Sequence, residues 1–276
     1  MGNERRRALV TGASRGVGRA AAVALARAGF DVAVTARTAR EGEGFDVGHD
    51  GARRALPGSV ESTAELVREA GVEALPLAVD LADPLSVGTL VGRLRERWGH
   101  VDLLVNNAIY TGRGAQAPVL GLSLADLGDE LAIDLVAPLA LITELVPGMI
   151  ERGGGTVINV TSAVAYVDPL DMGSYGVGYA VGKGGLFKVA GILAVELGDR
   201  GLRAYNVHPG FVLTERMQLH MADVAGLDPS QAAPPEVCGS VVAWLADNPD
   251  PAPTNGSLIE SQALCAELGL VEGWPS

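Results

Sequence analysis

Short apolar runs rich in β-branched residues alternate along this chain with longer segments whose apolar residues recur at helical spacing. The short runs predict strands at 8–10, 32–35, 74–79, 101–105, 156–160, 203–207 and, more weakly, 257–259. The longer segments predict helices at 16–28, 60–70, 84–98, 124–150, 174–199 and 235–246. This order favours right-handed βαβ units, and nearly continuous apolar strands are typical of a sheet covered on both faces. We therefore expect an α/β fold, a doubly wound parallel sheet of about seven strands with helices on both faces.

Two segments depart from the alternation: 38–58, which is rich in glycine and charge, and 218–234. Neither looks like a Pro/Ser-rich linker that would divide the chain, so we expect one domain over 1–276. Long irregular segments in compact domains often carry function. We expect the region 211–234 to contain a segment that covers the substrate.

A glycine-rich turn, Thr11 to Gly18, joins the first predicted strand to the first predicted helix. Such a turn lets the backbone approach a pyrophosphate, and the N–H groups at the helix N-terminus bind anions. The alternative is a tight connection without a ligand, since the chain has 37 glycines. The placement after strand one favours a dinucleotide site in a Rossmann-type fold. The expected cofactor contacts in this turn are Gly12, Ser14, Arg15, Gly16, Val17 and Gly18.

The end of the second strand predicts the choice of cofactor. A dinucleotide fold that binds NAD normally has an acid there, which holds the ribose. This chain has Thr35-Ala36-Arg37 instead. Arg37 can pair with a 2′-phosphate, and Arg15 is expected on the same side, because guanidinium groups grip phosphate in a planar, bidentate way. The sequence therefore favours NADP(H) over NAD.

Composition narrows the class of protein. Apolar residues make up 48% and charged residues 20%, which is ordinary for a soluble globule. The net charge of -12 offers no basic footprint for nucleic acid. Two cysteines are too few for a disulfide framework and favour a reduced, cytoplasmic setting. Charges, glycines or prolines interrupt every longer apolar stretch before the ~18 residues of a membrane span. We expect no membrane segment and no metal site.

Tyr179 and Lys183 are four residues apart in a predicted helix, so they share one of its faces. The ordinary pKa of tyrosine, about 10, makes it a poor acid–base group at neutral pH, but a neighbouring ammonium lowers that pKa by stabilising the phenolate. Tyr179 can then give a proton to a carbonyl oxygen or remove it in the reverse reaction. Ser162, after strand 156–160, can hydrogen-bond the same oxygen. For Tyr179 and Lys183 the alternative is a solvated helix face.

Four motifs follow one another in the chain. They are the turn Thr11 to Gly18, Asn106-Asn107-Ala108, Ser162 followed by Tyr179-Ala180-Val181-Gly182-Lys183, and Pro209-Gly210 with Thr214. With this ordered set the sequence resembles the short-chain dehydrogenase/reductase family over 7–260, in the branch without an added substrate domain.

The resemblance implies roles for individual residues. Tyr179 would be the acid/base, Lys183 its activator and a ligand of the nicotinamide ribose, and Ser162 the group that polarises the substrate. Further cofactor contacts implied in this way are Asp80, Leu81, Asn107, Ala108, Pro209, Gly210, Val212 and Thr214. For Asp80, a plain role in the approach to the next helix is a fair alternative.

Two positions depart from the family pattern. Ile109 stands where Asn-Asn-Ala is usually followed by glycine. Asp134 stands at the position of a fourth catalytic member, an asparagine that supports a water between the lysine and solvent. Pro138 cannot donate to the carbonyl of Asp134, so we predict that this carbonyl holds the relay water. The alternative is that Asp134 belongs to the polar surface of its helix.

These observations predict an NADP(H)-dependent oxidoreductase that acts on a small, apolar carbonyl or alcohol substrate. One alternative is a catalytically silent NADP-binding sensor or scaffold on the same fold. Another is an NAD-dependent alcohol dehydrogenase, which the missing acid at Ala36 disfavours. The predicted helices 124–150 and 174–199 are apolar on more than one face, as in subunit contacts, and the resemblance also implies a homodimer or homotetramer.

Overall fold

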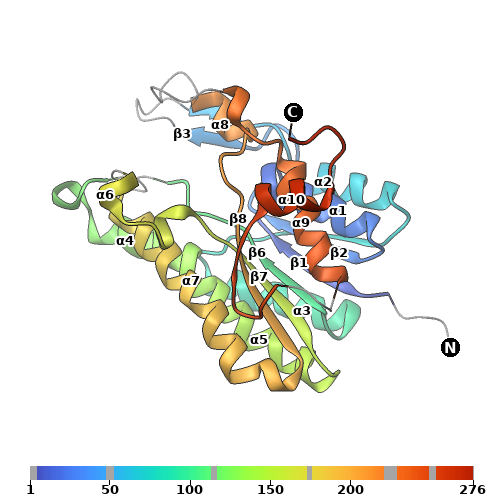
Figure 1. Cartoon of the computed structure of the whole chain (residues 1–276). Helices are drawn as coiled ribbons and strands as arrows, with labels where there is room; N and C mark the ends of the chain where they lie inside the picture. Colours follow the sequence, from blue (N-terminus) through green and yellow to red (C-terminus); the bar gives the residue numbers. More distant parts are fainter. Residues whose placement is uncertain are drawn as a thin grey trace. The chain divides into compact units, whose positions relative to one another are not determined.

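The computed structural model describes residues 5–47, 53–112, 117–172, 176–220, 229–248 and 253–275. Seven strands form one sheet, which confirms the predicted α/β fold, and Figure 1 labels several of them. Their order in the sheet is β5 (Ala74–Ala78), β2 (Asp31–Ala36), β1 (Arg7–Thr11), β6 (Leu103–Asn106), β7 (Gly155–Val160), β8 (Leu202–His208) and β9 (Leu258–Glu260). The chain clusters into two compact units. Unit 1 comprises Met1–Ala78, Pro209–Ala252 and Ile259–Ser276, and unit 2 comprises Val79–His208 and Pro253–Leu258.

In unit 1, three parallel strands form the framework of the glycine-rich turn. They are β1 (Arg7–Thr11), β2 (Asp31–Ala36) and β5 (Ala74–Ala78). The apolar residues 8–10 of β1 and 32–34 of β2 are fully buried, as expected where helices cover both faces of a sheet. The helices of this unit are α1 (Gly16–Arg27), α2 (Val60–Glu69), α8 (Glu215–His220), α9 (Pro235–Asp247) and α10 (Ser261–Leu268), with α1 packed against α9.

The segment 38–58 was expected to be irregular, and that expectation is wrong in part. Phe45–Val47 (β3) pairs antiparallel with Arg53–Ala55 (β4) in a separate two-stranded sheet. The guanidinium of Arg53 lies over the ring of Phe45, 3.3 Å from its centroid. This cation–π contact stabilises a short pairing that strand periodicity is too brief to reveal. In the region 211–234, residues 221–228 lie outside the described part of the chain.

In unit 2, the parallel strands are β6 (Leu103–Asn106), β7 (Gly155–Val160) and β8 (Leu202–His208), and the predicted catalytic residue Ser162 follows β7. The last strand of the sheet is β9 (Leu258–Glu260). The α-helices are α3 (Pro84–Trp98), α4 (Leu124–Leu131), α5 (Ala137–Glu151), α6 (Pro169–Met172) and α7 (Val177–Leu197).

A π-helical turn, Ala132–Val136, interrupts the helix predicted over 124–150 and separates α4 from α5. The N–H of Ala137 donates to the carbonyl of Ala132, five residues back. Pro138 has no N–H for the carbonyl of Asp134, which is a physical reason for the irregular turn at this point.

The stretch Leu124–Glu151 is long and apolar enough to cross a membrane by length and composition. Half of its apolar window is buried within the structure. A core helix of a soluble protein has the same properties, so this stretch is weak evidence for a membrane span.

Candidate active site

The predicted dinucleotide turn leaves β1 with the backbone conformation that glycine favours. Gly12 and Gly16 have φ angles of 65° and 55°, and the N–H of Ala13 donates to the carbonyl of Thr35 at 2.9 Å. A Cβ on Gly16 would lie 3.1 Å from Cγ2 of Thr214. The turn therefore needs glycine at position 16, where α1 begins, for both conformation and space.

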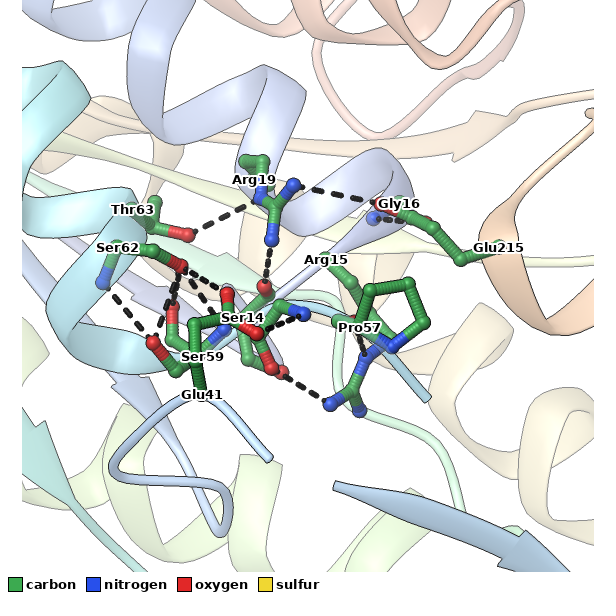
Figure 2. A network of polar contacts seen from close by, with 11 residues as sticks. Ser14, Arg15, Gly16, Arg19, Glu41, Pro57, Ser59, Ser62, Thr63 and Glu215 are labelled. Carbon is green, nitrogen blue, oxygen red and sulfur yellow. Dashed lines mark hydrogen bonds and ion pairs between the residues drawn. The ribbon is translucent and has the colours of Figure 1, made fainter. Parts of the chain in front are cut away.

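A backbone N–H at the N-terminus of α1 already donates a hydrogen bond to a carboxylate of this chain. The N–H of Gly16 donates to Oε2 of Glu215 at 2.9 Å, and Oε1 of Glu215 lies 3.5 Å from Nη1 of Arg19 (Figure 2). Arg19 also donates to the carbonyl of Ser14 at 2.7 Å. The turn therefore binds an anionic group, as its position before a helix predicts. Nothing in the sequence motif pointed to Glu215, which is 199 residues away from Gly16.

Arg15 is held by residues of the segment 38–58. Its guanidinium donates to the carbonyls of Pro57 at 2.9 Å and Gly58 at 2.8 Å, and to the hydroxyl of Thr38 at 3.2 Å. Burial lowers the pKa of Arg15, while the carboxylate of Glu215 raises it. Arg15, which the sequence predicts to bind the 2′-phosphate of the cofactor, is thus already hydrogen-bonded within unit 1. The side chain of Arg37 is exposed at the end of β2.

Glu41 fixes the chain beside these arginines. It accepts from the N–H of Gly58 at 2.9 Å and from the hydroxyl of Ser62 at 2.8 Å, and these bonds lower its pKa (Figure 2). Ser59 and Ser62 form a capping box that begins α2. The carbonyls of Pro57 and Gly58, which accept from Arg15, are therefore fixed by the start of α2.

In unit 2, α7 brings the predicted acid/base and its activator together. The Nζ atom of Lys183 lies 6.0 Å from the ring centroid of Tyr179. Lys183 is 1% exposed and donates to the carbonyl of Val160 at 3.0 Å. Burial lowers the pKa of Lys183, and the carboxylate of Asp134 acts in the opposite direction. A solvated helix face is therefore wrong for Lys183.

Ser162 follows β7 by two residues and precedes the 3₁₀ turn η3 (Ala163–Ala165). Its hydroxyl does not cap this turn, whereas its carbonyl accepts from the N–H of Ala165 at 3.0 Å. The turn packs against α7, and Lys183 is bonded to the last residue of β7. The end of β7 and one part of α7 thus position Ser162 near Lys183.

Asp134 is fully buried on the π-helical turn, so the alternative of a polar helix surface is wrong. Its Oδ1 accepts from the N–H of Tyr110 at 2.7 Å. Burial raises the pKa of Asp134, while Lys183 and the Tyr110 bond lower it. Glu130, one turn earlier, is also fully buried. No motif marked it, although its spacing of four from Asp134 on an apolar helix was a usable signal.

The other predicted cofactor residues lie at loops that follow strands. Asp80 accepts from the N–H of Ala82 at 3.0 Å, which matches the alternative of a helix approach. The hydroxyl of Thr214 accepts from the N–H of Met217 at 3.2 Å. Residues at these strand ends for which no contact decides a role are Leu81, Asn107, Ala108, Pro209, Gly210 and Val212. The turn, Arg37 and Thr214 belong to unit 1, whereas Asp80 and the catalytic residues belong to unit 2.

Comparison with known proteins places these features in a family. The family model described as short chain dehydrogenase matches residues 6–224. The chain belongs to this family. This short-chain dehydrogenase is 31% identical over 229 residues to an uncharacterized oxidoreductase of Mycobacterium tuberculosis, covering 83% of this chain and 77% of the relative. It is 34% identical to the D-threitol dehydrogenase of Mycolicibacterium smegmatis, covering 75% and 70%.

Solved structures agree with the fold of this short-chain dehydrogenase. Acetoin dehydrogenase from Enterobacter cloacae has 25% identity and a TM-score of 0.71, covering 93% of this chain and 94% of that one. A structure from Beutenbergia cavernae, assigned to an NAD(P)-dependent gluconate 5-dehydrogenase, has 28% identity and a TM-score of 0.73 with the same coverage, and it holds NADP at low occupancy. Oxidoreductase chemistry with a nicotinamide cofactor is thus a property of the family.

Proposed function

We propose that this short-chain dehydrogenase is an NADP(H)-dependent enzyme that interconverts a carbonyl and an alcohol, with Tyr179 as general acid/base. The observation that carries the proposal is the position of Lys183. Its ammonium is buried 6.0 Å from the Tyr179 ring centroid and bonded to Val160, two residues before Ser162. A protein that only binds the dinucleotide has no need for this proton-donating arrangement, so it disfavours a silent sensor or scaffold.

The chemistry follows from these side chains. In the reductive direction the hydroxyl of Tyr179 gives its proton to the substrate oxygen, and the ammonium of Lys183 stabilises the phenolate left behind. In the oxidative direction the phenolate takes the proton back. The hydroxyl of Ser162 donates a hydrogen bond to the same oxygen and orients it. When bound, the nicotinamide supplies or accepts the hydride.

The glycine-rich turn fits the phosphates of such a cofactor. The N–H of Gly16 already donates to a carboxylate, so this helix end accepts an anionic group. Gly12, Ser14, Gly16 and the residues between them would hold the pyrophosphate, and Lys183 the nicotinamide ribose. We assign the 2′-phosphate first to Arg37, because Arg15 is held by Pro57, Gly58 and Thr38.

The substrate is proposed as a small, apolar ketone or secondary alcohol. Relatives named for D-threitol and for 3-oxoacyl-[acyl-carrier-protein] support carbonyl/alcohol chemistry. Leu170 on α6 is 93% exposed and available as a lining residue. Two further apolar residues that we propose for this lining, Tyr175 and Met221, lie outside the described residues.

We also propose a homodimer or homotetramer of single-domain subunits in the cytoplasm. Apolar side chains on α7 and around the start of α5 are exposed in the isolated chain: Val136, Leu139, Val181, Ile192 and Val195. Contact with a second subunit would remove this apolar surface from water.

The proposal is tested by NADPH oxidation with a panel of aliphatic ketones, aldehydes and quinones, in parallel with NADH. Saturable turnover with at least one carbonyl and preference for NADPH are expected. The catalytic part fails if the folded protein binds NADPH and turns over none of the panel. A preference for NADH would instead support the NAD-dependent alcohol dehydrogenase.

A further inference from the structure

Three charged side chains of unit 2 are almost fully shielded from water in the described part of the chain: Glu130, Asp134 and Lys183. Two are carboxyl groups one helical turn apart, and one is an ammonium. Full ionisation of all three would leave a net negative charge in a buried place, which is costly. Uptake of one proton removes that excess charge.

The packing of α7 places the two carboxyl groups beside the catalytic residues. A Cβ on Gly178 would collide with Oε2 of Glu130, and a Cβ on Gly182 would lie 3.0 Å from Cβ of Asp134. Gly178 directly precedes Tyr179, and Gly182 directly precedes Lys183. The two glycines therefore make room for one acidic side chain each, next to the two members of the predicted catalytic pair.

Hydrogen bonds distinguish the two carboxyl groups. Oδ1 of Asp134 accepts from the N–H of Tyr110 at 2.7 Å, and Lys183 further favours its ionised form. Neither oxygen of Glu130 has a hydrogen-bond partner among the described residues. The elements packed against α4 are the π-helical turn, with Asp134, and α7, with Tyr179, Lys183 and the exposed Lys188. Burial and the charge of Asp134 raise the pKa of Glu130 to about 7.

We propose that Glu130 is a positioning residue for this reaction: it keeps a proton at neutral pH, and that proton decides whether Asp134 alone or both carboxyl groups carry a negative charge against α7. The inference rests on the proposed function of Tyr179 and Lys183. With the proton in place, a single carboxylate opposes the ammonium. When Glu130 loses the proton, a second negative charge favours protonated Tyr179 and charged Lys183. Glu130 thus extends the alkaline range in which Tyr179 can act as an acid.

The test compares the pH profiles of kcat for carbonyl reduction in the wild type, Glu130→Gln and Asp129→Asn. Gln resembles protonated Glu in shape and cannot ionise, so Glu130→Gln should retain the activity of the wild type near pH 6. Its alkaline limb should move to lower pH by up to about one unit, the size expected for one nearby charge in a partly shielded site. Asp129→Asn removes an exposed charge from the same helix and should leave the profile unchanged. Superimposable profiles of the wild type and Glu130→Gln would overturn the proposal and leave the function of Tyr179 intact.

Infrared titration of the protein without substrate gives a second readout that does not depend on turnover. A protonated carboxyl band that titrates near neutral pH is expected in the wild type and should be missing in Glu130→Gln. Absence of this band from the wild type, or its persistence in the folded Glu130→Gln protein, would overturn the proposal that Glu130 keeps a proton. If no carbonyl is reduced, the proposed function fails, and this titration still decides the state of Glu130.

Discussion

Lys183 is the residue on which the proposed chemistry of this short-chain dehydrogenase depends. An ammonium without exposure to water is unfavourable unless it is paired and hydrogen-bonded. The carbonyl of Val160 and the carboxyl group of Asp134 meet that requirement, and the ring centroid of Tyr179 lies 6.0 Å from the ammonium. The buried ammonium of Lys183 therefore lies near Tyr179, the group whose ionisation it is proposed to favour.

Tyr179→Phe removes the proposed proton donor and little else. We expect reduction to fall by more than ~10²-fold, because general acid catalysis and its activation are both lost. NADPH affinity should stay near that of the wild type. Steady-state rates and fluorescence titration with NADPH measure the two effects, and Tyr205→Phe, on buried β8, serves as a control for loss of a tyrosine hydroxyl. Substantial turnover by Tyr179→Phe would rule out Tyr179 as the acid.

Arg37→Ala tests the choice of cofactor. Loss of one charge-assisted contact costs ~1.5–3 kcal/mol, so the KM for NADPH should rise roughly ten- to hundredfold. The KM for NADH should change little, because NADH has no 2′-phosphate. Kinetics with both cofactors at one substrate concentration are sufficient. Equal effects on the two would show that Arg37 does not contact that phosphate.

Helix α8 connects the glycine-rich turn to the short β3–β4 sheet. Glu215 accepts from the N–H of Gly16, and Arg216 next to it donates to the buried carboxylate of Asp46 on β3 at 3.1 Å. In Figure 2, Arg19 points toward both Thr63 and Glu215, so α1, α2 and α8 share one polar network. The carboxylate of Glu215 thus accepts from the N–H of Gly16, a donor that we assign to the cofactor's pyrophosphate.

Glu215→Gln is therefore expected to bind NADPH several-fold more tightly than the wild type, since a negative charge next to the pyrophosphate is removed. Fluorescence titration with NADPH measures the change. Glu236→Gln, an exposed first-turn residue of α9, removes the same charge and should have no such effect. Weaker binding by Glu215→Gln would mean that Glu215 supports the cofactor.

The stability of the protein as a whole should also report on Glu130. Its pKa rises from 4.5 to about 7 on folding, so the folded state binds the proton more tightly than the unfolded state. The contribution of Glu130 to the free energy of unfolding is therefore fully present below pH 4.5 and is lost as the pH rises to about 7. The loss is about 3 kcal/mol at most, at 1.36 kcal/mol for each pKa unit.

Urea unfolding at pH 5 and pH 8 measures this contribution. Glu130→Gln should lose less stability than the wild type between the two values, whereas Asp129→Asn should follow the wild type. An equal loss in Glu130→Gln and the wild type would contradict a raised pKa of Glu130.

The sequence by itself determined the positions of the seven strands along the chain, the position of the glycine-rich turn and the placement of Tyr179 and Lys183 on one helix face. Each of these depends on spacing along a few neighbouring residues: apolar runs, one strand-to-helix turn, and two positions four apart on a helix. The seven predicted strands are present because a doubly covered sheet needs apolar residues on both faces of every strand. The pattern of 38–58 was too short and too polar to reveal β3 and β4.

Only the tertiary structure decided the burial and the partners of the charged groups. Gly16 and Glu215 are 199 residues apart, and Arg15 is bonded to carbonyls more than 40 residues away. The same holds for Asp134 and Glu130, whose place against glycines of α7 follows from helix packing. Spacing in the sequence cannot encode such contacts, because the field at a charged group depends on every element packed around it.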